Sequence, residues 1–200
     1  MADHYYTNNP SVESNRQTFD FLLNGSKFTF ITDAGVFSKK EIDFGSRLLI
    51  EAFVSPSVEG GILDVGCGYG PIGISIAKSY LDKQVTMVDV NERALQLATE
   101  NAANNKVNNV TIVKSYIYES IQNNKYAAIV SNPPIRAGKK VVHEILEKAY
   151  DRLVDNGELW IVIQKKQGAP SAIDKLEEIF EEVEVVLKKK GYYIIKAKKG

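Results

Sequence analysis

The tetrad Asn132-Pro133-Pro134-Ile135 directly follows an apolar run at residues 126–131. Asn132 can offer a side-chain carbonyl and Pro133 a backbone carbonyl, and an exocyclic amine has two N–H donors that need two acceptors. The lone pair of such an amine is delocalised into its ring. Hydrogen bonds from both N–H groups would favour the pyramidal amine and aim its lone pair at a methyl donor. The competing interpretation is an ordinary turn that ends a strand.

A glycine-rich loop lies upstream, Asp64-Val65-Gly66-Cys67-Gly68-Tyr69-Gly70. Its glycines let the backbone turn sharply at a strand end and approach a ligand closely. S-adenosylmethionine carries a sulfonium and an ammonium, so an acid such as Asp64 suits it electrostatically. Asp89 ends the next predicted strand, where a carboxylate can accept hydrogen bonds from both ribose hydroxyls. Alternatively, Asp89 is only an acid near the start of a helix that Asn91 caps.

A nicotinamide dinucleotide is the competing cofactor. Residues 68–73 satisfy the pattern G-x-G-x-x-G, and Asp89 follows about twenty residues later. Dinucleotide loops, however, begin their glycine turn directly after the strand to seat a pyrophosphate, whereas here Asp64 and Gly66 come first. Because an acid would repel that anion, we expect S-adenosylmethionine. The cofactor-binding residues predicted from this part of the chain are Asp64, Gly66, Cys67, Gly68, Gly70, Asp89 and Val90.

The elements that must position these residues alternate along the chain. From residue 61 onward, short apolar strands alternate with helical patterns, which indicates an α/β fold with a mostly parallel sheet covered by helices on both faces. Strands are predicted at 62–65, 84–89, 110–114, 127–131, 158–164, 183–187 and 192–196. Helices are predicted at 42–53, 71–80, 92–105, 141–153 and 171–180.

Two short turns fix the ends of this arrangement. The Lys190-Gly191 turn is too short for anything but an antiparallel pair of last strands. Near the N-terminus, residues 17–23 and 26–32 alternate with period two around Asn24-Gly25, which predicts a β-hairpin. A seven-stranded, mostly parallel sheet with an antiparallel last strand is typical of the class I methyltransferase (Rossmann-like) fold.

Length and composition predict one domain. Two hundred residues with 44% hydrophobic content are enough for one sizeable core. We expect a polar, disordered tail at 1–15 and a single methyltransferase domain at 16–200, divided into an N-terminal extension at 16–58 and a Rossmann-like core at 59–200. No apolar run approaches the roughly 18 to 20 residues of a spanning helix, so a cytoplasmic protein without a membrane segment is expected. Cys67 is the only cysteine, so no metal site is expected.

Charge is balanced overall but uneven along the chain. The first hundred residues hold 8 basic and 13 acidic side chains, and the second hundred hold 17 and 12. Arg136, Lys139 and Lys140 follow the tetrad, where they could meet a nucleic-acid phosphate. The alternative is a solvated lysine-rich surface, and for the C-terminal lysines protection of a strand edge.

Asp64 to Gly70, Asp89, Asn132-Pro133-Pro134 and Gly35-Val36-Phe37-Ser38 together resemble the ribosomal RNA small-subunit guanine-N(2) methyltransferase family, over nearly the whole chain from residue 28 to 195. The resemblance implies an S-adenosylmethionine-dependent enzyme that methylates the 2-amino group of guanine in small-subunit (16S) ribosomal RNA. Its partner would be that RNA or the small ribosomal subunit. The catalytic residues would be Asn132, Pro133 and Pro134.

The resemblance also implies a lid at residues 35–38, near the methionine end of the cofactor. Phe37 and Asn132 are further predicted cofactor-binding residues. Position 135 is Ile where amino-methyltransferases mostly have an aromatic that stacks on the target base, so stacking is expected from elsewhere, such as Phe37. Relatives often place an acid for the adenine amine after the third strand. This chain has Ser115-Tyr116 there, so Ser115 or a backbone group is expected to substitute. The predicted substrate-binding residues are Ile135, Arg136, Lys139 and Lys140.

Other functions stay open. The planar amide of a protein glutamine also has two N–H donors that Asn132 and Pro133 could accept, and so does another nucleobase amine. From different classes, the chain could be a cofactor-binding or RNA-binding module without turnover, or a nicotinamide enzyme. Titration with S-adenosylmethionine and with NADH separates the cofactors.

Overall fold

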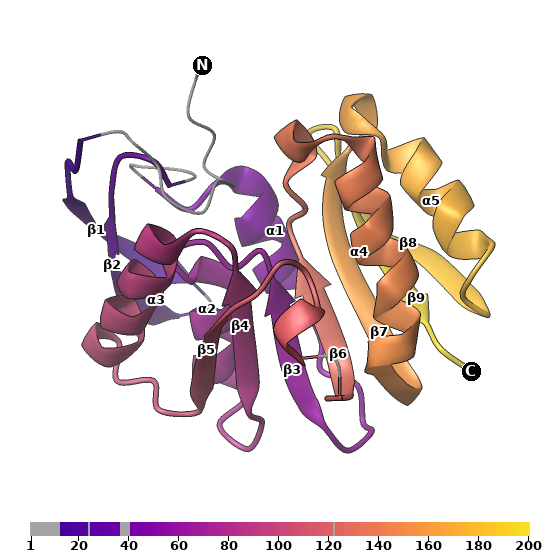
Figure 1. Ribbon diagram of the computed structural model, residues 1–200, viewed down its shortest axis with the longest axis horizontal. Coiled ribbons are helices and arrows are strands. Elements are labelled where there is room, and N and C mark those ends of the chain that lie inside the picture. Colours follow the sequence, from indigo (N-terminus) through magenta and orange to yellow (C-terminus); the bar gives the residue numbers. More distant parts are fainter. Residues whose placement is uncertain (1–12, 24, 37–40, 122) are drawn as a thin grey trace.

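The computed structural model describes residues 13–23, 25–36, 41–121 and 123–200. Its centre is a seven-stranded sheet in the order β5-β4-β3-β6-β7-β9-β8 (Figure 1). The strands are β3 (Gly61–Val65), β4 (Val85–Asp89), β5 (Val110–Lys114), β6 (Tyr126–Ser131), β7 (Leu153–Gln164), β8 (Glu182–Lys189) and β9 (Tyr192–Lys198). β9 runs antiparallel to both β7 and β8, and the other paired strands are parallel. The predicted fold class is confirmed.

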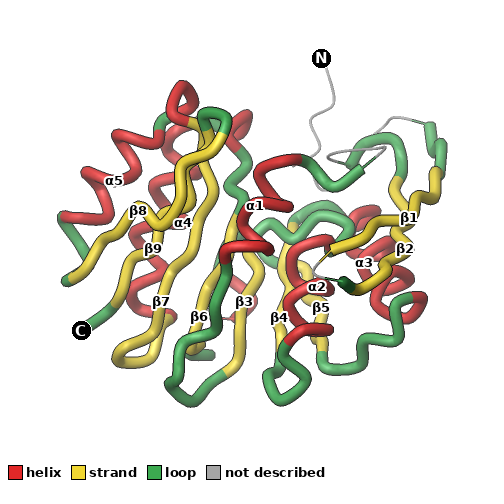
Figure 2. The backbone as a smooth tube through the Cα atoms, turned by 180° about the vertical axis from the view of Figure 1, so that it is seen from behind, coloured by secondary structure: helices red, strands yellow, loops and turns green. Residues whose placement is uncertain are grey.

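Five helices cover the two faces of the sheet. α1 (Phe44–Ala52), α2 (Pro71–Ser79) and α3 (Glu92–Asn104) bury their apolar side chains in one core, and α4 (Lys139–Arg152) and α5 (Ala169–Glu177) bury theirs in another. Figures 1 and 2 view the sheet from opposite sides, with α4 and α5 in front in Figure 1 and α1 and α2 in front in Figure 2. All six residues of β6 are buried, as the double covering of a central parallel strand requires.

The predicted N-terminal hairpin is confirmed, with β1 (Gln17–Leu23) antiparallel to β2 (Ser26–Thr32). Asn24 of its turn lies outside the described residues. β2 lies against α3, where two asparagines one helical turn apart replace a neighbouring strand. The Asn101 side chain accepts from the Ile31 N–H at 2.7 Å and donates to the Ile31 carbonyl at 2.9 Å. Asn105 does the same for Thr29, at 3.0 and 2.8 Å.

Three predicted boundaries differ because of local backbone geometry. α4 begins at Lys139 instead of residue 141, since Gly138, at φ 99°, lets the chain turn directly into the helix. β7 begins at Leu153 instead of residue 158, and its pairing with β6 shifts register within the added segment. α5 begins after Gly168, at φ 111°, because Pro170 is tolerated in a first turn. Most other boundaries agree within two residues.

The carboxyl ends of the parallel strands meet at one edge of the sheet, which is where open α/β sheets bind ligands. The chain leaves β3 into the glycine loop, β4 at Asp89, β5 at Ser115 and β6 at Asn132. A short 3-10 helix, η1 (Glu119–Ile121), follows β5 in the stretch left unassigned by the sequence. None of the described helices is long and apolar enough to span a membrane.

Candidate active site

A cavity of about 490 Å³ opens at this edge, within the usual size range of ligand sites. It brings together most of the predicted site residues. Those that line it are Gly66, Cys67, Gly68, Asp89, Val90, Ser115, Asn132, Pro133, Pro134, Ile135 and Arg136. Asp64 and Gly70 belong to the same loop but do not line the cavity, and Lys139 and Lys140 line a separate shallow hollow beside it. Phe37 lies outside the described residues.

The glycine loop leaves room for a ligand where side chains would otherwise stand. Gly66 and Gly68 have φ of 74° and 57°, and a Cβ on either would meet nothing within 4 Å. A Cβ on Gly70 would instead come within 2.7 Å of Ile74 Cδ1, so that glycine is required by packing. Cys67 is buried, and burial raises the pKa of its thiol well above the ordinary value. It therefore fills the loop and is no nucleophile.

Asp64 is fully buried, and its two oxygens differ. Oδ2 accepts a hydrogen bond from the Gly73 N–H at 2.8 Å, whereas Oδ1 has no hydrogen-bond partner in the described part of the chain. Burial raises the pKa of the Asp64 carboxyl to about 7, the Gly73 bond opposes this, and the charge of Asp89 adds to it. A nearby cation would favour the ionised form of this buried carboxyl, so the residue is suited to stand behind a cationic ligand group.

Asp89 lies at the cavity wall and is hydrogen-bonded by the backbone. Its Oδ2 accepts from the Gly68 N–H at 2.8 Å and its Oδ1 from the Asn91 N–H at 2.9 Å. Burial raises the pKa of its carboxyl, and these N–H groups oppose the rise. The Val90 N–H is a third backbone donor to this carboxylate, which leaves it acceptor capacity for a further donor in the cavity. Asn91 also caps α3, because its side chain accepts from the Ala94 N–H at 3.2 Å. The helix cap is therefore Asn91, and Asp89 is still located at the cavity wall.

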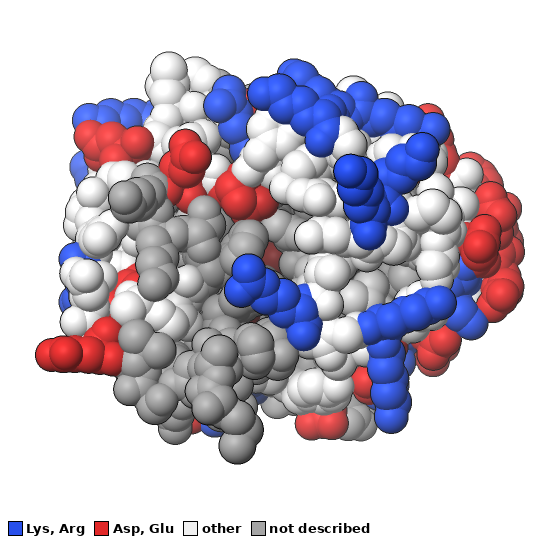
Figure 3. All heavy atoms as spheres, turned by 90° about the horizontal axis from the view of Figure 1, so that it is seen from above, with Lys and Arg blue, Asp and Glu red and all other residues white. Residues whose placement is uncertain are grey.

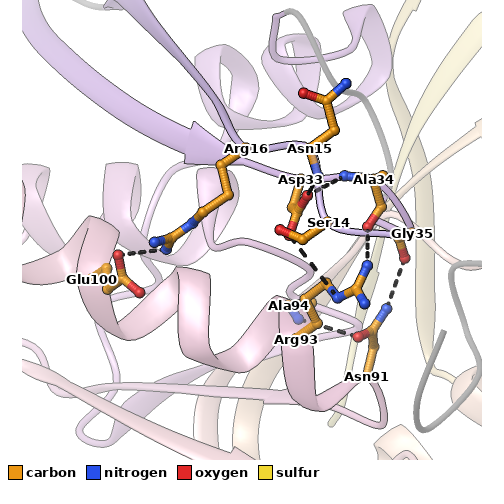
Figure 4. A network of polar contacts seen from close by, with 10 residues as sticks. All are labelled: Ser14, Asn15, Arg16, Asp33, Ala34, Gly35, Asn91, Arg93, Ala94 and Glu100. Carbon is orange, nitrogen blue, oxygen red and sulfur yellow. Dashed lines mark hydrogen bonds and ion pairs between the residues drawn. The ribbon is translucent and has the colours of Figure 1, made fainter. Parts of the chain in front are cut away.

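The first turn of α3 holds a segment from the N-terminal extension beside the cavity (Figure 4). Asn91 donates to the Gly35 carbonyl at 3.0 Å, and an Arg93 Nη donates to the Ala34 carbonyl at 2.7 Å. Asp33 lies 4.0 Å from the Arg93 Nε and accepts a hydrogen bond from Ser14, near the end of the predicted tail. Val36, which follows this anchored segment, lines the cavity. Arg93 has no motif that would have marked it in the sequence.

Asn132 has a fixed orientation. Its side-chain nitrogen donates to Ser46 Oγ at 2.9 Å and to Asp43 Oδ1 at 3.3 Å. Because a carboxylate only accepts, the amide nitrogen must face α1, and the amide oxygen is turned away from it. That oxygen has no hydrogen-bond partner among the described residues. Asp43 is also the N-cap of α1, accepting from the Ser46 N–H at 3.0 Å.

Asp43 and Ser46 were not identified from the sequence. The only signal is a capping acid at the start of the helix predicted from residue 42, which does not indicate a contact with Asn132.

At the other end of the cavity, the Ser115 hydroxyl forms hydrogen bonds within its own turn. It donates to the Ile117 carbonyl and accepts from the Ser120 N–H, both at 3.1 Å. One lone pair remains on that hydroxyl, so it can substitute for the missing acid only as a single acceptor.

Basic side chains gather at the mouth of the cavity. Arg136 lines it and is exposed, and Lys139 and Lys140 occupy the first turn of α4, which contains no acid. Cations add there to the positive end of the helix dipole, an arrangement that attracts anions instead of stabilising the helix. Figure 3, looking down on this edge, shows Lys and Arg side chains clustered over one part of the face. Within the described ranges, Lys139 and Lys140 form no ion pair with an acid.

The glycine loop after β3 and the Asn132-Pro133 pair after β6 line one cavity. Together with the family match, this site belongs to an S-adenosylmethionine-dependent methyltransferase and not to a nicotinamide enzyme. The chain belongs to the methyltransferase small domain family, whose match covers residues 27–196. This membership, with the relatives below, confirms the resemblance seen in the sequence. The described residues contain no group of three or more His, Cys, Asp or Glu that would hold a metal ion.

Two relatives with known sequences differ in how much of their length this chain matches. An uncharacterized protein of Bacillus subtilis, YbxB, is 62% identical over 200 residues, covering all of both chains. The ribosomal RNA small subunit methyltransferase C of Aeromonas hydrophila is 39% identical over 141 residues, or 68% of this chain and 40% of that protein. This chain thus spans less than half the length of that relative.

Among solved structures, a Thermus thermophilus 16S rRNA N2 methyltransferase (RsmC), in complex with AdoMet and guanosine, matches with a TM-score of 0.83 at 24% identity. The match covers 96% of this chain and 52% of that one. A methyltransferase from Pyrococcus furiosus matches with a TM-score of 0.66 at 22% identity. At these identities the structures establish the fold.

Proposed function

We propose that the protein methylates the 2-amino group of a guanine in small-subunit (16S) ribosomal RNA. The observation that carries this proposal is the orientation of Asn132, whose amide nitrogen is held by Asp43 and Ser46 and whose amide oxygen is left free. A residue that served only as a turn would not need both bonds. The arrangement prepares one acceptor for an N–H of the substrate, and the Pro133 carbonyl supplies the second.

The cofactor would occupy the side of the cavity opposite Asn132 and Pro133, next to the glycine loop. S-adenosylmethionine supplies an electrophilic methyl group when bound. Asp64, buried directly behind the loop with one oxygen unpartnered, would favour its cationic end, and the remaining acceptor capacity of Asp89 would serve the ribose hydroxyls. Gly66 and Gly68 leave space for it, and the predicted set also contains Cys67, Gly70, Val90, Ser115 and Asn132. The role of Phe37 stays a prediction from the sequence.

The chemistry needs acceptors more than it needs a strong base. Two carbonyls that accept both N–H groups favour the pyramidal amine and hold its lone pair in one direction. The nitrogen becomes cationic when it gains a methyl group, and the surplus proton can then leave. Pro133 and Pro134 keep the backbone stiff and offer no competing N–H donor.

The basic side chains at the mouth of the cavity favour RNA over a protein as the substrate. Arg136, Lys139 and Lys140 are exposed there, and a cationic rim attracts phosphates. Several relatives at 32 to 39% identity are named ribosomal RNA small subunit methyltransferase C, and the Thermus structure contains guanosine. Guanine, the 2-amino group and the ribosomal partner are taken from these relatives as parts of the proposal. A protein glutamine amide is the competing substrate.

The test is reconstitution with S-adenosylmethionine and either naked 16S ribosomal RNA or small subunits, followed by digestion and mass spectrometry of the nucleosides. The wild-type protein should form N2-methylguanosine. The Asn132→Ala variant should lose at least about a hundredfold in rate, as removal of one transition-state hydrogen bond does elsewhere. Its affinity for the cofactor, measured by calorimetry, should be nearly unchanged. Retained activity would show that Asn132 is only a turn residue.

A further inference from the structure

The cavity continues past Asn132 to the ends of β7 and β9. Gln164, Gln167 and Tyr192 line it there, and none of them has a part in the function proposed above. The side chains of Gln164 and Gln167 and the Tyr192 hydroxyl have no hydrogen-bond partner in the described part of the chain. Two carboxamides and a phenol at one end of a ligand cavity are therefore available to a ligand.

Strand register places Gln164 and Tyr192 on the same face of the sheet as Asn132. The pairing of β6 with β7 ends at Ser131 and Ile161, so β7 continues for three more residues, about 10 Å, to reach Gln164. Gln164 is paired with Tyr192 on β9. Side chains two residues apart on a strand share a face. Val130, Val162 and Ile194 all lie in the core beneath α1, so the residues two positions further toward this edge face α1 as well.

The start of α1 fixes the ring of Tyr192. Its centroid lies 5.4 Å from that of Phe44, with the planes tilted by 56°. A Cβ on Gly45 would come within 2.8 Å of Tyr192 Cε1, so the ring lies where only a glycine leaves space for it. The same turn of α1 that orients Asn132 therefore orients Tyr192. Ile135 lines the cavity too but packs on the core beneath α4 and α5, and so approaches from the opposite face.

We infer that this end of the cavity binds the target base, with the Tyr192 ring supplying the aromatic surface that position 135 lacks and Gln164 reading the base edge. The inference rests on the proposed function. Guanine presents an N–H donor at N1 and an acceptor at O6, next to its 2-amino group. The carboxamide of Gln164 offers the matching acceptor and donor, and discrimination against adenine would come from the 2-amino group that adenine lacks. Stacked, splayed-out bases read at this edge are the usual mode of sequence-specific RNA recognition.

A kinetic experiment tests the stacking. The Tyr192→Leu variant should raise the KM for RNA by about tenfold to a hundredfold, the size found for base–aromatic stacking, with the affinity for S-adenosylmethionine unchanged. Tyr192→Phe should behave as wild type. The matched control is Tyr193→Leu, because Tyr193 lies on the same strand but packs against the other core. Equal effects of the two leucine variants would overturn the inference.

A binding experiment needs no turnover and so separates this inference from the proposed function. Guanosine 5′-monophosphate is titrated into the protein loaded with S-adenosylhomocysteine, and the Ile135 methyl resonance is followed by NMR after assignment with Ile135→Val. A base between Ile135 and Tyr192 should shift that resonance upfield by its ring current, and Tyr192→Leu should abolish the shift. Adenosine 5′-monophosphate, which lacks the 2-amino group, should shift it less, and Gln164→Leu should weaken the shift caused by guanosine 5′-monophosphate. An unmoved resonance would refute the base subsite even if the protein methylates RNA, and a shift without RNA methylation would refute only the proposed function.

Discussion

At the scale of single residues, the site depends on polar atoms that the protein leaves without a partner. The side-chain oxygen of Asn132 and Oδ1 of Asp64 are both in this state among the described residues. The sequence alone identified both residues, because two prolines follow Asn132 and the glycine loop begins at Asp64. It did not reveal their orientation. Asp43 and Ser46 are 89 and 86 residues away from Asn132 along the chain, and only folding brings them into contact.

If Asp64 favours the cationic end of the cofactor, as proposed, cofactor binding should depend on pH. Its carboxyl has an ordinary pKa of 3.8, raised to about 7 in the folded protein mainly by burial. Below pH 7 the free protein therefore holds a proton on Asp64, which a cationic ligand must displace. We expect the affinity for S-adenosylmethionine to fall by up to about tenfold per pH unit below 7 and to level off above it. Calorimetry across pH 5 to 9 measures this.

Asp64→Asn provides the control for that titration, because it keeps the shape of the side chain and removes its proton. The variant should bind more weakly at high pH and should lose the step near pH 7, while any titration of the cofactor itself persists. If the wild type and the variant give parallel curves, Asp64 does not face the cationic end of the cofactor.

At the scale of elements, α1 and α3 connect the N-terminal extension to the Rossmann-like core. The hairpin was predictable because its strands alternate and its turn contains Asn24-Gly25. The position of the hairpin against α3 was not predictable. The side chains of Asn101 and Asn105 form the hydrogen bonds that a neighbouring strand would form, and an asparagine in a predicted helix does not indicate such bonds. Asn101 also donates to the Tyr69 carbonyl in the glycine loop at 2.9 Å, so the hairpin is linked to the cofactor cradle.

Replacing Asn101 should loosen this link. Asn101→Ala leaves three backbone groups without partners, those of Ile31 and the carbonyl of Tyr69, and should lower the free energy of unfolding by roughly 2 to 4 kcal/mol. Urea denaturation measures the change. The control is Asn104→Ala, which lies exposed on the same helix and should change stability by no more than about 0.5 kcal/mol. Equal losses in both variants would contradict the docking role.

At the scale of the whole molecule, basic side chains are concentrated near the mouth of the cavity. The excess of basic residues in the second hundred positions was visible in the sequence. Its location was not, because α4, the short 3-10 helix η3 (Lys165–Gln167) and the β8–β9 turn meet at one face only in the folded chain. Lysines elsewhere on α5 and β9, such as Lys175 and Lys196, pair with acids, which is consistent with a structural role for them.

RNA affinity should therefore depend on salt through the residues at the mouth. Replacing Lys139 and Lys140 together by Gln should reduce the slope of log affinity against log salt by about 1.4, the value for two phosphate contacts on a single strand. The measurement is fluorescence anisotropy with labelled 16S ribosomal RNA fragments over a range of salt. Lys125→Gln is the control, since Lys125 is exposed just before β6, at the opposite edge of the sheet. A slope unchanged in the double variant would place the RNA elsewhere.

Guanine in small-subunit ribosomal RNA, the proposed substrate, can be tested in cells. Nucleosides of 16S ribosomal RNA are compared by mass spectrometry between cells that lack the protein and the same cells complemented with wild type or with Asn132→Ala. N2-methylguanosine should decrease in cells without the protein and should be restored by the wild type only. Identical nucleoside profiles in all three strains would contradict this proposal.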